Sequence, residues 1–179
     1  MKNNTQHHAD LLQEVACDNE RLSLPSWVTH APRRPGETGH GKLSAAEWRT
    51  FSTVNLVITL GRLWGYQDTS STYLAQLHNF FHLVMLVQVA MRHSTSPDSI
   101  KEYNSYVKTY FTDFRKLYPT ASITPNHHLL FHFGRVLERW GPAPNWWAFP
   151  YERFNGLLQH IHTNSKFGAL FRSPFCLWC

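Results

Sequence analysis

The sequence predicts an all-α protein, built as a single helical domain of about five helices. Apolar stripes with helical period run through most of the chain, and no segment alternates apolar and polar residues in the manner of a strand. Helix-start and helix-stop signals separate these stripes. Apolar residues make up 42% of the 179 residues, which favours a packed core over a disordered chain.

The N-terminal region is expected to lie outside the main helical domain. Residues 1–24 are polar apart from one short apolar stripe, which predicts a peripheral helix. Residues 25–42 hold three prolines and three glycines, which predicts an extended linker. We therefore assign residues 1–39 to an arm and linker and residues 40–168 to the helical domain. Residues 169–179 form a tail after it.

The first helix of the domain is predicted at residues 44–65. Ser44 followed three positions later by Glu47 is the pattern of a capping box, in which each side chain binds the backbone N–H of the other residue. Gly65 follows the last apolar position and is expected to end the helix in the left-handed conformation that glycine adopts easily.

The second helix, at residues 71–93, is apolar on nearly every face. A helix of this kind is usually buried on all sides, so we expect it to be central and surrounded by the others.

The remaining helices are predicted at residues 96–117, 124–141 and 150–163. The first two open on Ser-Pro and Thr-Pro, a capping residue followed by a proline at the first helical position. The helix at 124–141 stops at Gly141, before a proline. The last helix follows a short aromatic turn.

The charge and the cysteine content limit which partners and compartments the sequence favours. A net charge of +5 favours nucleic acid or an acidic surface as the partner, although the basic residues are spread along the chain. Three cysteines form no disulfide framework, and no signal peptide is evident. We expect a nuclear or cytoplasmic protein that is not secreted. No apolar run is long enough to cross a bilayer, so we expect no membrane partner.

Twelve histidines raise the question of metal binding. His78 and His82 are four positions apart on one predicted helix, and His128 and His132 have the same spacing on another. Two such pairs facing each other would give zinc its four tetrahedral ligands. The alternative is that these histidines are polar positions on partly buried helices.

Four segments resemble a region of transposase-derived proteins of fungi. They are HGKLSAAEWR at 40–49, PNHH at 125–128, WWAFPYERFNG at 146–156 and TNSKFG at 163–168. Together they are similar to the C-terminal region of CACTA (En/Spm) and Kyakuja-Dileera-Zisupton transposases.

The resemblance implies a DDE-type DNA transposase, in which three carboxylates of an RNase H-like core hold two Mg²⁺ or Mn²⁺ ions for phosphodiester transfer. Glu152 is the position that matches the third, helix-borne carboxylate. A second interpretation is that Glu152 stabilises the start of its helix through the helix dipole. Arg153 and Lys166 then become candidate contacts to nucleic acid, and Arg153 alternatively forms an ion pair.

The chain contains no strand that would carry the other two carboxylates. We therefore expect a fragment of a larger RNase H-like transposase, without catalytic activity alone and with weak, non-specific DNA binding. Its partners would be DNA or the remaining transposase domains, and self-association is a further expectation. The alternative function is a helical protein-interaction module with no nucleic-acid role. A third interpretation is a histidine-based zinc protein.

Overall fold

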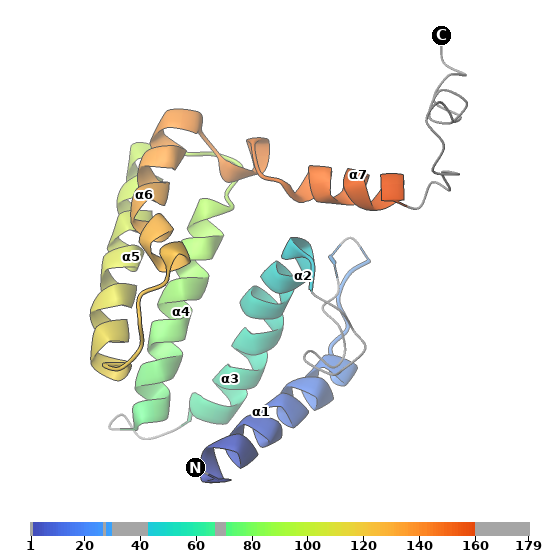
Figure 1. Ribbon diagram of the computed structural model, residues 1–179, viewed down its shortest axis with the longest axis vertical. Helices are drawn as coiled ribbons and strands as arrows, with labels where there is room; N and C mark the ends of the chain where they lie inside the picture. Colours follow the sequence, from blue (N-terminus) through green and yellow to red (C-terminus); the bar gives the residue numbers. More distant parts are fainter. Residues whose placement is uncertain (1, 27, 30–42, 67–70, 160–179) are drawn as a thin grey trace. The chain divides into compact units, whose positions relative to one another are not determined.

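The computed structural model describes residues 2–26, 28–29, 43–66 and 71–159, and every regular element among them is helical (Figure 1). This confirms the all-α prediction for that part of the chain. The chain forms two compact units, one up to Trp146 and one from Trp147. The elements are α1 (Lys2–Arg21), α2 (Ala45–Thr50), the π-helical turn η1 (Phe51–Asn55), α3 (Leu56–Trp64), α4 (Thr72–Ala90), α5 (Pro97–Leu117), α6 (Pro125–Trp140), the 3₁₀ turn η2 (Ala143–Asn145) and α7 (Phe149–Gln159).

Three helices begin where the sequence predicted, because each start is fixed by side chains within three positions of it. Ser44 and Glu47 form the expected capping box, with the Ser44 backbone N–H donating to the Glu47 carboxylate at 2.7 Å. Ser96 and Thr124 accept hydrogen bonds from the backbone N–H groups three residues on, each ahead of a proline. These contacts satisfy N–H groups that have no partner inside the helix.

The predicted helix 44–65 differs from the expectation in two ways. It divides into α2, η1 and α3, because Phe51–Asn55 forms a wider π-helical turn. A π turn brings residue i+5 under residue i, and the buried side chains of Thr50 and Asn55 have that spacing. The prediction of a left-handed cap at Gly65 is wrong, since its φ of −69° is right-handed and its N–H still bonds to the Gly61 carbonyl.

Helix α1 packs against α3 in the first unit (Figure 1). Val15 is buried, and the Arg62 guanidinium lies 2.6 Å from the Glu14 carboxylate and 3.0 Å from that of Asp18. The predicted helix within residues 1–24 is therefore present. It packs on α3 and forms ion pairs with it, so it is not a loose arm. Most of the predicted linker 25–42 and all of the tail 169–179 lie outside the described residues.

Helix α4 lies between α3 and α5, and α6 packs on α5 (Figure 1). The side chains that these helices bury together include Leu86, Tyr103, Val107 and Leu137. Tyr103 is fully buried, and its hydroxyl donates to the Leu130 carbonyl at 3.1 Å. The predicted central position of α4 is confirmed by these contacts.

The expectation that α4 is surrounded on all sides is wrong. His78, Met85 and Gln88 remain exposed on one side of it. Positions 78, 85 and 88 fall on one face at helical spacing, and Thr72, Tyr73 and Ala75 near the start of the helix are exposed as well.

Helix α6 ends at Gly141 as predicted. Gly141 has a φ of +77°, a conformation that side chains disfavour, and its N–H bonds to the Leu137 carbonyl. The Trp146 indole N–H donates back to the Gly141 carbonyl at 3.1 Å. The first compact unit ends at this tryptophan.

The second unit contains α7, whose described side chains are not buried. Four large apolar side chains on it are each more than half exposed. They are Tyr151, Phe154, Leu157 and Leu158. The predicted helix 150–163 is observed up to Gln159, and its remaining residues lie outside the described part.

Candidate nucleic-acid interface

One side of α5 carries a row of cations. Lys101, Lys108 and Arg115 are spaced by seven residues, which is close to two helical turns, and all three are exposed. Lys101 lies 3.3 Å from Asp98, whereas no ion pair of Lys108 or Arg115 is found among the described residues. The latter two cations are thus available to an external anion.

A second row follows α6. His128, His132, Arg135 and Arg139 fall at positions i, i+4, i+7 and i+11, which place them on one face, and all four are exposed. Neither arginine forms an ion pair within the described part of the chain. Glu138 is the only acidic residue of this helix. We call the rows on α5 and α6 together the basic face.

The two rows border the contact between α5 and α6. The rings of Phe111 and Phe131 stack across this contact at 4.4 Å. Arg115 follows Phe111 by four residues and Arg135 follows Phe131 by four, so each arginine lies one turn along the same side of its helix.

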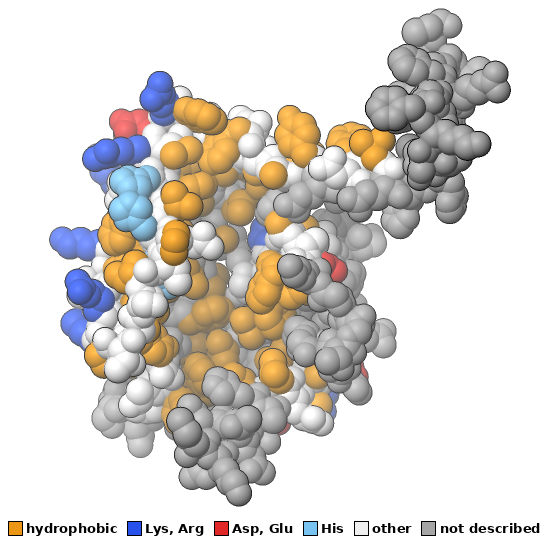
Figure 2. All heavy atoms as spheres, in the orientation of Figure 1, with side chains coloured by type: hydrophobic (Ala, Val, Ile, Leu, Met, Phe, Trp, Pro, Cys, Tyr) orange, Lys and Arg blue, Asp and Glu red, His pale blue; other side chains and the backbone are white. Residues whose placement is uncertain are grey.

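A second close approach between these helices supports the same geometry. A methyl group placed on Gly134 of α6 would collide with the side-chain amide of Asn104 on α5. Lys108 is one turn beyond Asn104, next to this point of contact. Figure 2 shows Lys, Arg and His side chains gathered along the edge formed by α5 and α6.

Few of the cations on the basic face form ion pairs with the acidic residues near these helices. Asp98, Glu102 and Asp113 pair with Lys101, Arg92 and Lys116 respectively. Four cations of the basic face keep no such partner in the described structure: Lys108, Arg115, Arg135 and Arg139. A low-dielectric protein surface with several unpaired charges of one sign attracts polyanions.

The four histidines singled out from the sequence lie on two helices. His128 and His132 are brought together on α6, with their Nε2 atoms 3.0 Å apart. His82 lies on α4, and its ring packs beside that of Tyr106 at 6.2 Å. The described residues include no group of three or more His, Cys, Asp or Glu side chains that could hold a metal ion. The four-histidine zinc site remains a prediction.

Glu152 and Arg153 lie in the first half of α7, in keeping with a position near a helix start. Their side chains and all of Lys166 lie outside the described part. A two-metal centre needs several carboxylates close together, and the described side chains do not provide such a set around any point.

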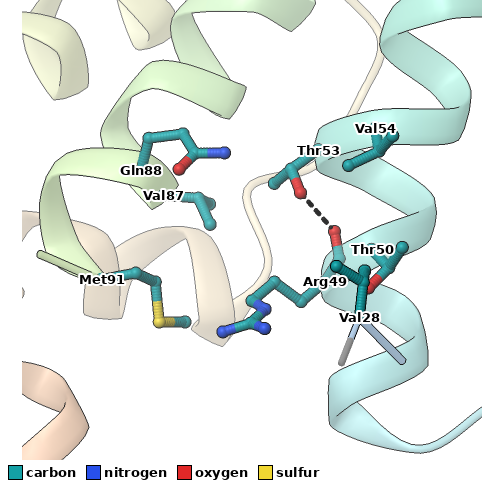
Figure 3. A pocket seen from close by; sticks show the side chains of 8 residues that line it. All are labelled: Val28, Arg49, Thr50, Thr53, Val54, Val87, Gln88 and Met91. Carbon is teal, nitrogen blue, oxygen red and sulfur yellow. Dashed lines mark hydrogen bonds between the residues drawn. The ribbon is translucent and has the colours of Figure 1, made fainter. Parts of the chain in front are cut away.

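A small cavity of about 230 Å³ opens between α2–η1 and the end of α4 (Figure 3). The Thr53 hydroxyl donates to the Arg49 carbonyl at 2.8 Å on one wall, and Gln88 and Met91 form the opposite wall. The described residues that line it include no carboxylate, imidazole or thiol. A threonine hydroxyl needs an adjacent base to become a nucleophile, and the described lining supplies none.

Sequence reasoning missed the basic face because it treated the basic residues as dispersed. The signal was present as the spacing of seven between Lys101, Lys108 and Arg115, and as the i, i+4, i+7, i+11 pattern that ends at Arg139. The spacing places each row on one face of a helix, but it cannot show that the two rows meet.

Compared with protein-family models, with curated proteins and with solved structures, the chain matches none of them. In the part of the chain that is described, no helix combines the length and the apolar character needed to cross a bilayer.

Proposed function

We propose that this chain is a transposase-derived helical region that binds nucleic acid through phosphate contacts along the basic face. The observation that carries the proposal is the set of four exposed cations, unpaired within the described structure, that border the α5–α6 contact. The resemblance of the segments at 40–49, 125–128, 146–156 and 163–168 to transposases of the CACTA and Kyakuja-Dileera-Zisupton groups supports the same function. In this proposal the chain is a fragment of a larger, RNase H-like enzyme.

The chemistry of the basic face favours binding without sequence preference. Lys and Arg side chains neutralise phosphates, which gives affinity but carries no information about the bases. Each cation that replaces a counterion adds to the salt dependence, so four cations predict a slope of log K against log salt of about −3 to −4.

The test measures binding of the full chain to labelled duplex DNA of mixed sequence by fluorescence anisotropy between about 50 and 200 mM salt. Replacing Lys108 and Arg135 with Gln is expected to weaken binding and to reduce the magnitude of the slope by about 2. Lys116→Gln is the matched control, because Lys116 also lies on α5 but is paired with Asp113 and lies outside the basic face.

Two results would overturn this proposal. One is equal binding by the wild type and by the Lys108→Gln, Arg135→Gln protein. The other is a footprint on one defined sequence that survives physiological salt, because phosphate contacts alone do not select a sequence.

The proposal includes the absence of DNA cleavage by the chain alone. One carboxylate at Glu152 cannot supply the bridging and flanking ligands of two metals. Supercoiled DNA incubated with the protein and Mg²⁺ or Mn²⁺ is expected to remain intact. Cleavage that Glu152→Gln abolishes would contradict this, and would show that partner carboxylates exist.

A second candidate function, a protein-interaction module, rests on a different observation. Tyr151, Phe154 and Leu158 of α7 have helical spacing and are 69%, 63% and 53% exposed. Contiguous exposed apolar side chains are typical of association surfaces.

The second candidate predicts that apolar contact through α7 drives self-association. Phe154→Lys and Leu158→Lys are expected to shift the full chain toward the monomer in sedimentation experiments. Asn155→Lys adds the same charge to the same helix at an exposed polar position and serves as the control. If all three variants change the sedimentation equally, added charge rather than lost apolar contact is responsible.

A further inference from the structure

The histidine pair on α6 has a geometry of its own. The Nε2 atoms of His128 and His132 lie 3.0 Å apart, and the ring centroids are separated by 4.7 Å at an interplanar angle of 72°. Both side chains are exposed, and the two nitrogens lie within hydrogen-bond distance of each other. In the metal-free chain the Nε2–H of one ring donates a hydrogen bond to the Nε2 of the other.

The nitrogen separation is closer to the requirement of some metal geometries than of others. Imidazole nitrogens bind a divalent transition metal at about 2.0–2.1 Å, so two nitrogens 3.0 Å apart subtend about 94° at the metal. A tetrahedral ion needs a separation of about 3.4 Å at the same bond length. The observed pair therefore fits two adjacent corners of a square-planar or octahedral ion, the arrangement preferred by Cu²⁺ and Ni²⁺.

We propose that His128 and His132 form a two-histidine site for Cu²⁺ or Ni²⁺ on the basic face, with the remaining coordination positions open to water or an anion. This site does not depend on nucleic-acid binding. It also differs from a four-histidine zinc site, because it uses one pair only and needs an angle near 90°.

The neighbouring histidine is excluded from the site by its own contacts. The Nδ1 atom of His127 accepts from the Thr124 backbone N–H at 3.3 Å, and its ring packs against Phe111 and Phe114. These contacts hold the His127 ring toward α5, whereas His128 and His132 face solvent.

Charged neighbours set the expected behaviour of the site. Arg135 and Arg139 continue the same face of α6, so they oppose a bound dication and favour an anion in its open positions. No carboxylate is part of the pair, and Glu138 lies toward α5, where it lines a pocket together with Lys101. Binding is therefore expected to be moderate in affinity and stronger in phosphate than in a buffer without a coordinating anion.

The experiment titrates the full chain, free of any histidine tag, with Cu²⁺ and with Ni²⁺ in a calorimeter. The chain has 12 histidines, so the informative quantity is the difference between matched variants. His128→Ala and His132→Ala are each expected to raise the dissociation constant of one bound metal ion by at least about tenfold. His93→Ala is the control, since His93 is exposed and follows α4.

A second readout separates chelation from a loss of folding. A metal held at positions i and i+4 stabilises α6, so Ni²⁺ is expected to raise the melting temperature of the wild type and of His93→Ala but not of His132→Ala. Unchanged circular dichroism of the metal-free variants shows that they are folded. The proposal is overturned if His132→Ala keeps the wild-type affinity and stoichiometry, or if Zn²⁺ binds this pair more tightly than Cu²⁺.

Discussion

Helices α6 and α7 are both amphipathic and separated by a few residues. They differ in whether their apolar side chains are buried. Helix α6 buries Gly134 and Leu137, and it exposes the histidines and arginines of the basic face. In α7 none of the described side chains is buried, and the exposed positions include Tyr151 and Phe154. The comparison shows that an apolar stripe has the same helical period whether or not neighbouring helices cover it.

This difference has energetic consequences. Most of the stability of a helix in a protein comes from packing of its apolar face rather than from intrinsic propensity. Substitutions in the core that α6 shares with α4 and α5 should therefore affect global unfolding, whereas substitutions in α7 should act locally.

The largest expected effect tests that contrast directly. Leu86 is 1% exposed in the core of the first unit, so Leu86→Ala is expected to lower the free energy of unfolding by about 2–5 kcal/mol. Leu158→Ala removes the same atoms from a side chain that is 53% exposed, and its effect is expected to stay within about 0.5 kcal/mol. Urea denaturation of both variants measures the difference. Equal losses would show that α7 is part of the same cooperative core.

Two glycines sharpen the comparison at the level of the backbone. Gly141 has a φ of +77°, so Gly141→Ala is expected to cost about 1–3 kcal/mol through strain. Gly156 lies inside α7, and a methyl group placed on it would meet open space, so Gly156→Ala is expected to increase helicity and to stabilise α7 by up to about 1 kcal/mol. Thermal unfolding should therefore move to lower temperature for Gly141→Ala, whereas circular dichroism should show added helix for Gly156→Ala.

The smallest effect concerns Tyr103, whose burial raises its pKa above the ordinary value. The folded protein then holds the phenol proton more tightly than the unfolded chain does. Stability that is fully present below about pH 10 is therefore lost as the pH rises toward the raised folded pKa. Tyr103→Phe removes the hydrogen bond to the Leu130 carbonyl at a cost of about 1 kcal/mol at neutral pH, and it should flatten the alkaline loss.

The control for the alkaline experiment is Tyr73→Phe, because Tyr73 is 47% exposed. Its stability profile from neutral to alkaline pH should follow that of the wild type. A Tyr103→Phe profile as steep as the wild type would show that other groups cause the alkaline loss.

The helix starts were predictable from the sequence because they depend on neighbours along the chain. Ser44, Ser96 and Thr124 bind backbone groups three residues away, so the pattern of the residues carries the whole interaction. The stop at Gly141 was predictable for the same reason. Gly65 shows the limit of this reasoning, because a glycine permits the left-handed conformation without requiring it.

The sequence by itself determined the helical class, the capped helix starts and the two rows of basic residues at helical spacing. The tertiary structure decided that α1 packs on α3, that one side of α4 stays open, and that the two basic rows border the contact at Phe111 and Phe131. The physical reason is how far apart along the chain the interacting residues lie. Caps and helical faces arise from residues within a few turns, whereas the meeting of faces depends on which helices pack together and at which register.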